Sequence, residues 1–200
     1  MRAAFPQGVR EEEAALTRGL TTVQTARAAR GLRWAGGRLF EILGTWAGEA
    51  NHPSIAVSMA TASRHLGWHL EDLDELVPDS VLLADDTAFE PPDAVGAALD
   101  AIRAIPGAPA RLGVAHRVLL ARMASRCVRI QRLASPHADA PFTRIVEFLL
   151  ADIRRDRDDG EVLLERLLLD ELAVNQVGER VVEAERRLVV AGGLFTDGLD

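Results

Sequence analysis

Residues 62–76 read ASRHLGWHLEDLDEL, and their spacing predicts one face of a long helix. The apolar residues Ala62, Leu66 and Leu73 follow at steps of four and seven, which is the pattern of a helix that packs in a bundle. The gap of seven is filled by His69, so a histidine occupies a position where the pattern requires an apolar residue. His65 lies one turn earlier on the same side. The stretch therefore predicts a helix with two inward histidines.

Four long segments share this helical spacing, and strand-like alternation is scarce. They cover about residues 21–50, 51–77, 109–134 and 141–172, with a short helix near 93–104 and a final amphipathic segment at about 175–190. Two short connections and one long connection join the four long segments. This order predicts an all-α fold, a four-helix bundle with a long crossover between helices two and three and an extra C-terminal helical segment.

The expected domain limits follow from composition at the two ends of the chain. Two hundred residues suffice for one domain with a full core. We expect a polar N-terminal arm at residues 1–18, one helical bundle at 19–190 and a C-terminal tail at 191–200.

Composition also limits the classes of function. The net charge of -7 and a pI near 5.3 argue against broad nucleic-acid binding. All 23 basic residues are arginine, which is typical of a GC-rich bacterial genome. The single cysteine, Cys127, excludes an intrachain disulfide and a multi-cysteine metal site. Because neither a signal peptide nor an apolar run of membrane-spanning length is visible, we expect a cytoplasmic protein that contacts no membrane.

Charge is segregated along the chain. Residues 71–100 contain ten acidic residues and no arginine, whereas residues 101–137 contain seven arginines and no acid. One interpretation is that the acidic segment is solvated surface near the arginine face of helix three. The other is that it forms a surface for a partner protein.

Polar side chains also interrupt the apolar faces of the other helices. His116 lies on the apolar face of helix three. On helix four, steps of three and four from Leu149 reach Asp152, Asp156 and Asp159. Helix one offers Glu41 on the flank of its apolar face. Antiparallel pairing of neighbouring helices would bring several of these groups level with one another.

A cluster of histidine and carboxylate inside a helical bundle suits iron or manganese, since buried charges need partners or a metal. The candidate metal ligands are Glu41, His65, His69, His116, Asp152 and Asp156. A second interpretation treats the histidines as core residues that are hydrogen-bonded to a carboxylate or carbonyl. A third pairs the aspartates with nearby arginines, in which case the apolar face of helix four shifts toward Phe148 and Ile153.

Over about residues 20–172 the chain resembles ferritin-like proteins, in particular the bacterial branch that includes the phenylacetyl-CoA oxygenase subunits. The resemblance rests on RLFEILGTW at 38–46, RHLGWHLEDLDELVP at 64–78 and RIVEFLLADIRRDRDDGE at 144–161. It implies a four-helix fold with an inward Glu41 and, in many members, two irons or manganese ions that activate dioxygen. Other members lack the metal and serve as structural subunits, so a homodimer or a partner protein is also implied.

The chain departs from the usual Glu-x-x-His metal motif of this superfamily. Ala62 stands three residues before His65, Leu66 stands three before His69, and Asp152 is followed three residues later by arginine. A standard di-metal centre is therefore not encoded.

Three hypotheses follow. One is an oxidoreductase with a non-standard His/carboxylate metal site that acts on a small metabolite, or a metal-free variant that keeps a His–Asp pair for acid–base work. The second is a non-catalytic ferritin-like subunit without metal that is structural or stabilises a partner. The third is a helical protein that binds a small ligand or regulates a partner.

Overall fold

The structure is a computed structural model that describes residues 19–76, 84 and 88–195. Every regular element in these ranges is a helix, which confirms the all-α prediction. The predicted N-terminal arm at 1–18 and part of the predicted tail lie outside the described residues. The elements are α2 (Thr22–Glu49), α3 (Pro53–Glu75), α5 (Asp93–Arg103), α6 (Ala108–Val114), the π-helix η2 (Ala115–Leu119), α7 (Leu120–Leu133), α8 (Ala140–Leu167) and α9 (Glu171–Val190).

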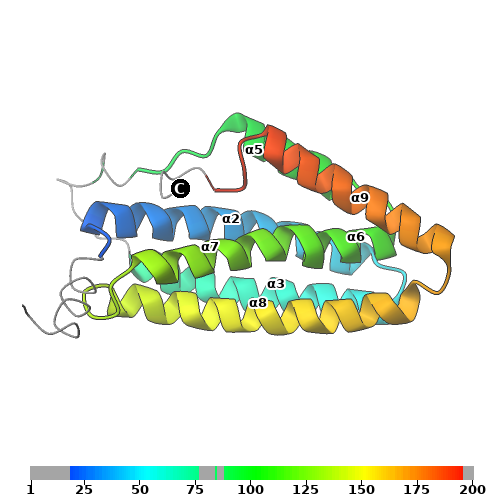
Figure 1. Ribbon diagram of the computed structural model, residues 1–200, viewed down its shortest axis with the longest axis horizontal. Coiled ribbons are helices and arrows are strands. Elements are labelled where there is room, and N and C mark those ends of the chain that lie inside the picture. The colour runs from blue at the N-terminus through cyan, green and yellow to red at the C-terminus, as the bar shows by residue number, and fades with distance from the viewer. Residues whose placement is uncertain (1–18, 77–83, 85–87, 196–200) are drawn as a thin grey trace, which may run out of the picture.

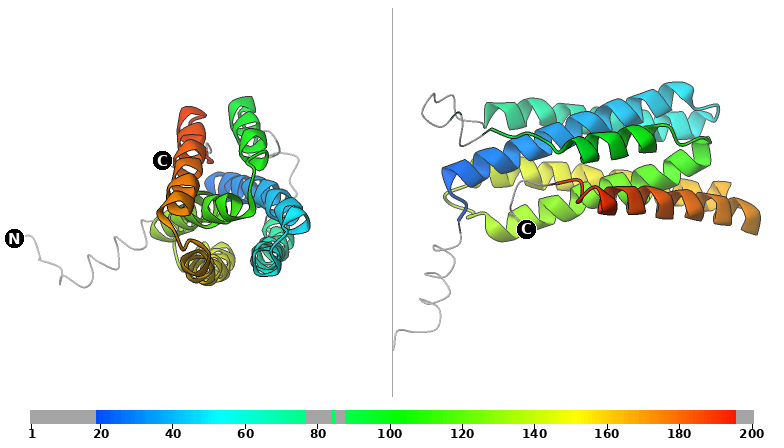
Figure 2. Two further views of the ribbon diagram at one scale, coloured as in Figure 1. Left: turned by 90° about the vertical axis from the view of Figure 1, so that its right-hand side faces the viewer. Right: turned by 90° about the horizontal axis from the view of Figure 1, so that it is seen from above.

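Four long helical segments lie side by side: α2, α3, the continuous run α6–η2–α7, and α8 (Figure 1). Viewed along their axes, α3 and α8 form one side of this helical core, while α5 and α9 lie beyond its opposite side (Figure 2). Within the described part of the chain, no helix is long and apolar enough to cross a membrane.

Local signals place the first helical hairpin. Thr21 caps α2, because its hydroxyl accepts from the backbone N–H of Gln24 at 3.2 Å and the Gln24 side chain accepts from the Thr21 N–H at 2.9 Å. α3 begins at Pro53, whose fixed φ suits the first turn of a helix and which needs no N–H partner there. The connection between them is so short that the two helices must run antiparallel.

Asp139 ties the start of α2 to the connection between α7 and α8. One carboxylate oxygen accepts from the backbone N–H of Ser135 at 2.8 Å and of Leu20 at 3.3 Å. The other oxygen accepts from the Thr25 hydroxyl at 3.2 Å. At the opposite end of the molecule the indole N–H of Trp46 donates to the backbone oxygen of Arg103 at 3.0 Å, which joins α2 to the end of α5.

The core lies between the four long segments and is filled mainly by leucine, isoleucine, valine and alanine. The apolar residues Leu112, Leu119, Met123, Cys127 and Ile130, which recur at helical spacing along α6–η2–α7, are all buried. α9 packs closely on α6, since a methyl group at Gly113 would stand 2.6 Å from a side-chain carbon of Val177. Glycine at 113 permits this approach.

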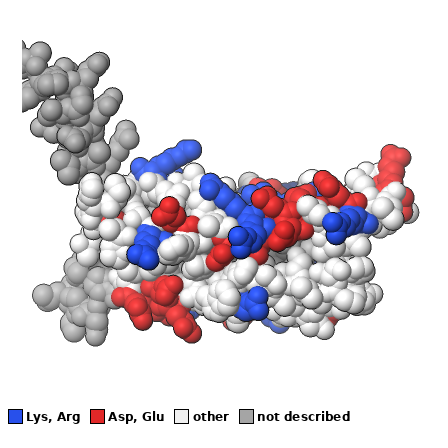
Figure 3. All heavy atoms as spheres, turned by 90° about the horizontal axis from the view of Figure 1, so that it is seen from below, with Lys and Arg blue, Asp and Glu red and all other residues white. Residues whose placement is uncertain are grey.

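The surface carries charges of both signs in close proximity, as the face containing α8 shows (Figure 3). The predicted position of the acidic segment beside helix three is wrong for two of its described residues. Asp74 pairs with Arg33 of α2 at 2.7 Å, and Asp100 pairs with Arg38 of α2. Exposed ion pairs of this kind add little to stability, so we regard them as solvated surface.

Candidate functional site

Two histidine–aspartate pairs connect α3 to α8. The ring nitrogen Nδ1 of His65 lies 3.0 Å from both carboxylate oxygens of Asp156. One turn further along α3, Nε2 of His69 lies 2.9 Å from a carboxylate oxygen of Asp152. The pairs run in opposite directions along the two helices, four residues forward on α3 and four residues back on α8. This is the register of two antiparallel helices with their polar groups matched turn by turn.

The face of α3 that meets α8 follows a simple spacing. Ser58, Ala62, His65 and His69 succeed one another at steps of four, three and four, so they lie in one row along the helix. The facing row on α8 consists of Asp152, Asp156 and Gly160, which are separated by one turn each. The inward orientation predicted for His69 is therefore found, since its residue is 7% exposed.

The His65–Asp156 pair is the more enclosed of the two. The side chains are 15% and 5% exposed, respectively. Burial raises the pKa of Asp156, while the hydrogen bond from His65 acts in the opposite direction. The Trp68 ring lies next to the imidazole, with ring centroids 5.4 Å apart. The position of the Asp156 carboxylate is therefore fixed by its hydrogen bond with His65.

The His69–Asp152 pair is open on its carboxylate side. The His69 side chain is 9% exposed and that of Asp152 is 32% exposed. The other ring nitrogen of His69, Nδ1, is buried and has no hydrogen-bond partner among the described residues. The bond to Asp152 is thus the one polar contact of this imidazole within the described part of the protein.

His116 lies apart from the two pairs, in the π-helix η2. It is completely buried, and its Nε2 lies 3.2 Å from the hydroxyl of Ser58. Its ring rests on Gly160 of α8, where a methyl group would stand only 2.3 Å from Cγ of the imidazole. Burial lowers the pKa of His116 from 6.5 to about 4, so the imidazole is neutral at physiological pH.

The wide turn of η2 is anchored to α8 by two arginines. Arg157 donates from Nε to the backbone oxygen of His116 at 3.0 Å. Arg117 forms a paired contact with Glu161, at 2.9 Å from Nε and 2.7 Å from the terminal nitrogen. The Arg117 hydrogen bond lowers the pKa of Glu161. A π-helix has looser hydrogen bonding than an α-helix, and these contacts hold the segment against α8.

The expected inward orientation of Glu41 is wrong. Its side chain is 58% exposed and contacts Arg38 of the same helix at 3.4 Å. Glu41 immediately precedes Ile42 and Leu43, which are buried, so it lies just beyond the edge of the apolar face. Glu41 is therefore surface charge that pairs with Arg38 of its own helix.

The apolar face of α8, the fourth long helix of the prediction, is also displaced from the predicted one. The buried positions are Phe142, Val146, Leu149, Leu150, Ile153, Asp156, Gly160 and Leu164. Of the three aspartates expected in this face, Asp156 alone is buried, whereas Asp152 is at the edge and Asp159 is exposed. The alternative shift toward Ile153 is correct, but Phe148 is 52% exposed.

The six candidate ligands do not gather into one metal centre. Among the described residues, no group of three or more histidine, cysteine, aspartate or glutamate side chains is placed to hold a metal ion. The iron or manganese that the resemblance implies does not fit the side chains as arranged: Asp156 is held by His65, Asp152 by His69, and His116 by Ser58. Metal binding itself stays a prediction that elemental analysis can test.

Sequence reasoning missed Ser58 and Gly160. Ser58 begins the row that continues through His65 and His69, and this row shares His69 with the apolar row predicted from the sequence. Gly160 interrupts a helix four residues after Asp156, and a glycine inside a helical pattern is a signal of close approach by another element.

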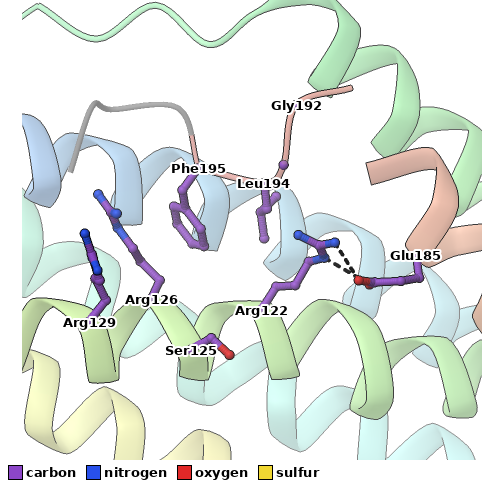
Figure 4. Close-up of a pocket in the computed structure, with 9 residues that line it drawn as sticks. Arg122, Ser125, Arg126, Arg129, Glu185, Gly192, Leu194 and Phe195 are labelled. Atoms are coloured by element: carbon purple, nitrogen blue, oxygen red, sulfur yellow. Dashed lines mark hydrogen bonds and ion pairs between the residues drawn. The ribbon is translucent and has the colours of Figure 1, made fainter. Parts of the chain in front are cut away.

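A pocket of about 480 Å³ lies between α7 and the residues that follow α9 (Figure 4). Arg122 donates to the Glu185 carboxylate at 2.6 and 3.0 Å, and the guanidinium of Arg126 lies 5.4 Å from the centre of the Phe195 ring. These contacts attach α9 and the segment after it to α7. None of the described residues that line the pocket belongs to α3 or α8, so the His–Asp pairs are not part of it.

Comparisons of the chain with protein-family models, with curated proteins and with solved structures gave no match.

Proposed function

We propose that this protein is a non-catalytic, ferritin-like helical subunit in which the inward histidines and aspartates hold the helices in register. The observation that carries the proposal is the one-to-one pairing across α3 and α8, His65 with Asp156 and His69 with Asp152. Each polar group is matched to a single partner. A catalytic metal requires several donors directed at one point and an open coordination position.

The pairs suit a register function for a geometric reason. If α8 slipped by one turn along α3, at least one of the two pairs would be broken and a buried polar group would lose its partner. Leaving a buried donor or acceptor unsatisfied costs about 1–3 kcal/mol. Buried polar pairs need not add stability over apolar residues, but they disfavour alternative alignments of the helices.

The order of the helices supports the ferritin-like part of the proposal. Two helical hairpins, α2–α3 and α6–η2–α7 with α8, are joined by one long connection that contains α5. This is the order that the resemblance over residues 20–172 predicts. The superfamily includes members without metal that act as structural subunits, and the paired interior agrees with that group.

Elemental analysis by inductively coupled plasma mass spectrometry tests the proposal. The protein would be expressed with added iron and manganese and purified without chelator or histidine tag. We expect metal well below one equivalent, with no difference between the wild type and His69→Leu. Near-stoichiometric iron or manganese that is lost in His69→Leu and retained in His137→Leu, an exposed control, would overturn the proposal and favour the metal-dependent oxidoreductase.

A further inference from the structure

The outer face of α3 carries a second row of residues that the helical core does not cover. Val57, Ala60, Arg64, Trp68 and Glu71 follow at steps of three or four and are exposed. Val57 is 66% exposed and Trp68 is 58% exposed. α5 and α9 lie on the opposite side of the helical core (Figure 2), so they do not shield this face. An exposed tryptophan in the middle of such a row is typical of a protein interface.

A groove of about 500 Å³ runs between this face and α2. Its floor is made of small residues that bring the two helices close together. At Gly67, a methyl group would stand 3.1 Å from the Phe40 ring, and the Ser63 hydroxyl donates to the backbone oxygen of Phe40 at 2.9 Å. Phe40 itself is 42% exposed and Trp68 borders the groove. The groove is therefore lined by apolar rings above a floor of small side chains.

The charges on this face are arranged symmetrically. Arg64 lies three residues before Gly67, and Glu71 lies three residues after Trp68, on the same side of α3. A two-fold axis through the Gly67–Trp68 step, perpendicular to the helix, would exchange these positions. Arg64 of one copy would then face the partner's Glu71, and Trp68 would face the partner's Gly67. A two-fold interface must be self-complementary in this way.

We propose that the outer face of α3 is the interface of a symmetric homodimer, with the two α3 helices packed antiparallel. The apolar content at the axis comes from Trp68, the space for the partner's tryptophan comes from the groove beside Gly67, and the two Arg64–Glu71 pairs fix the register. The Arg64 guanidinium already lies over the Trp68 ring, at 5.2 Å from its centroid. In the dimer it stays on that ring while it contacts the partner's carboxylate.

Charge exchange gives a sharp test. Sedimentation equilibrium of the full chain would measure the dimer dissociation constant for the wild type, Arg64→Glu, Glu71→Arg and Trp68→Ser. We expect each single variant to weaken the dimer by tenfold or more, since like charges then face one another across the axis or the central ring is lost. Glu147→Arg and Arg155→Glu, which reverse exposed charges on α8, serve as controls and leave the constant unchanged.

Mixing the two charge variants makes the test specific for self-association. In an equimolar mixture, Arg64→Glu on one chain faces Glu71→Arg on the other, and both contacts are attractive. A heterodimer is therefore expected to form at concentrations at which each variant alone is monomeric. A monomeric wild type would overturn the proposal, and so would a dimer that resists all three substitutions or a mixture that remains monomeric.

This inference is independent of the paired histidines. A stoichiometric metal would refute the proposed function and leave the dimer intact. A monomer without metal would refute the dimer and leave the proposed function intact.

Discussion

The imidazole of His116 packs directly on Gly160, leaving no room for even a methyl group between η2 and α8. Gly160→Ala would place its Cβ 2.3 Å from the ring, and both side chains belong to packed helices that cannot easily separate. We expect a loss of about 3 kcal/mol in the free energy of unfolding, measured by urea denaturation.

A double substitution shows whether the ring is the cause. Adding His116→Ala to Gly160→Ala creates space for the methyl group, so the two costs should combine with a coupling of at least about 1 kcal/mol. Gly178→Ala on α9 is the matched control, because no atom of the described residues lies within 4 Å of the added carbon. It should stabilise by about 0.5–1 kcal/mol, as helical alanine is favoured over glycine. Simple additivity of the first two substitutions would contradict the close contact.

Buried neutral His116 makes the protein sensitive to mild acid. Its pKa is lowered from 6.5 to about 4 in the folded state, so the unfolded chain binds the proton more readily between these values. Stability therefore falls as the pH decreases from about 6.5 to about 4. This histidine accounts for a loss on the order of 3 kcal/mol over that range.

Urea unfolding at several pH values measures this dependence. His116→Gln removes the titrating ring, and the slope of stability against pH in this window should flatten. His137→Gln, at an exposed histidine between α7 and α8, should keep the wild-type slope. An unchanged slope in His116→Gln would show that other groups carry the acid sensitivity.

Removing one member of the His65–Asp156 pair should destabilise the protein more than replacing both members by apolar residues. Asp156→Ala leaves the partly buried N–H of His65 without this acceptor, and we expect a loss of about 1–3 kcal/mol. His65→Leu combined with Asp156→Leu replaces both groups by apolar ones and should lose less. The exposed pair Arg117–Glu161 is the comparison, where either truncation costs about 1 kcal/mol or less. A larger loss in the double than in the single variant would argue against a purely structural pair.

The Cys127 thiol should not react with thiol reagents in the folded protein. It is completely buried, and burial raises the pKa of the thiol to about 12. At pH 8 a thiol-specific colorimetric reagent should react only after unfolding in urea, because the thiolate is the reactive form. Rapid reaction of the native protein would mean that α7 opens readily in solution.

The helix positions are the part of the structure that sequence signals predict well, since they depend on local chemistry. Thr21 and Pro53 mark the starts of the first two helices within a residue or two. α8 ends at Leu167 and not at the predicted 172, because the apolar run Leu167–Leu169 continues past the end without glycine or proline. The signal at that point is Asp170, which caps α9 by accepting from the N–H of Ala173 at 2.7 Å.

The sequence predicts that polar residues lie in the interior, but it does not predict all of their positions. His65, His69 and Asp156 follow from helical spacing, which fixes the side of the helix on which they lie. The outward position of Glu41 depends on which part of the α2 surface the neighbouring helices bury. That is set by packing between elements and not by local sequence. The π-helix was not predictable either, because its wide turn is held by contacts such as Arg157 with the backbone of His116, from another part of the chain.

The wide turn of η2 lets the continuous helical run α6–η2–α7 pack against different neighbours along its length. An additional residue in a turn rotates everything that follows by about 100°, the angle that one residue occupies in an α-helix. α6 packs chiefly on α9 and α7 chiefly on α8, although they form one run from Ala108 to Leu133. Removing a single residue from Ala115–Leu119 would restore an ordinary helix and turn one half of the rod away from its neighbour. A change in the length of η2 would therefore force the helices to repack, more so than a substitution of any one of its side chains.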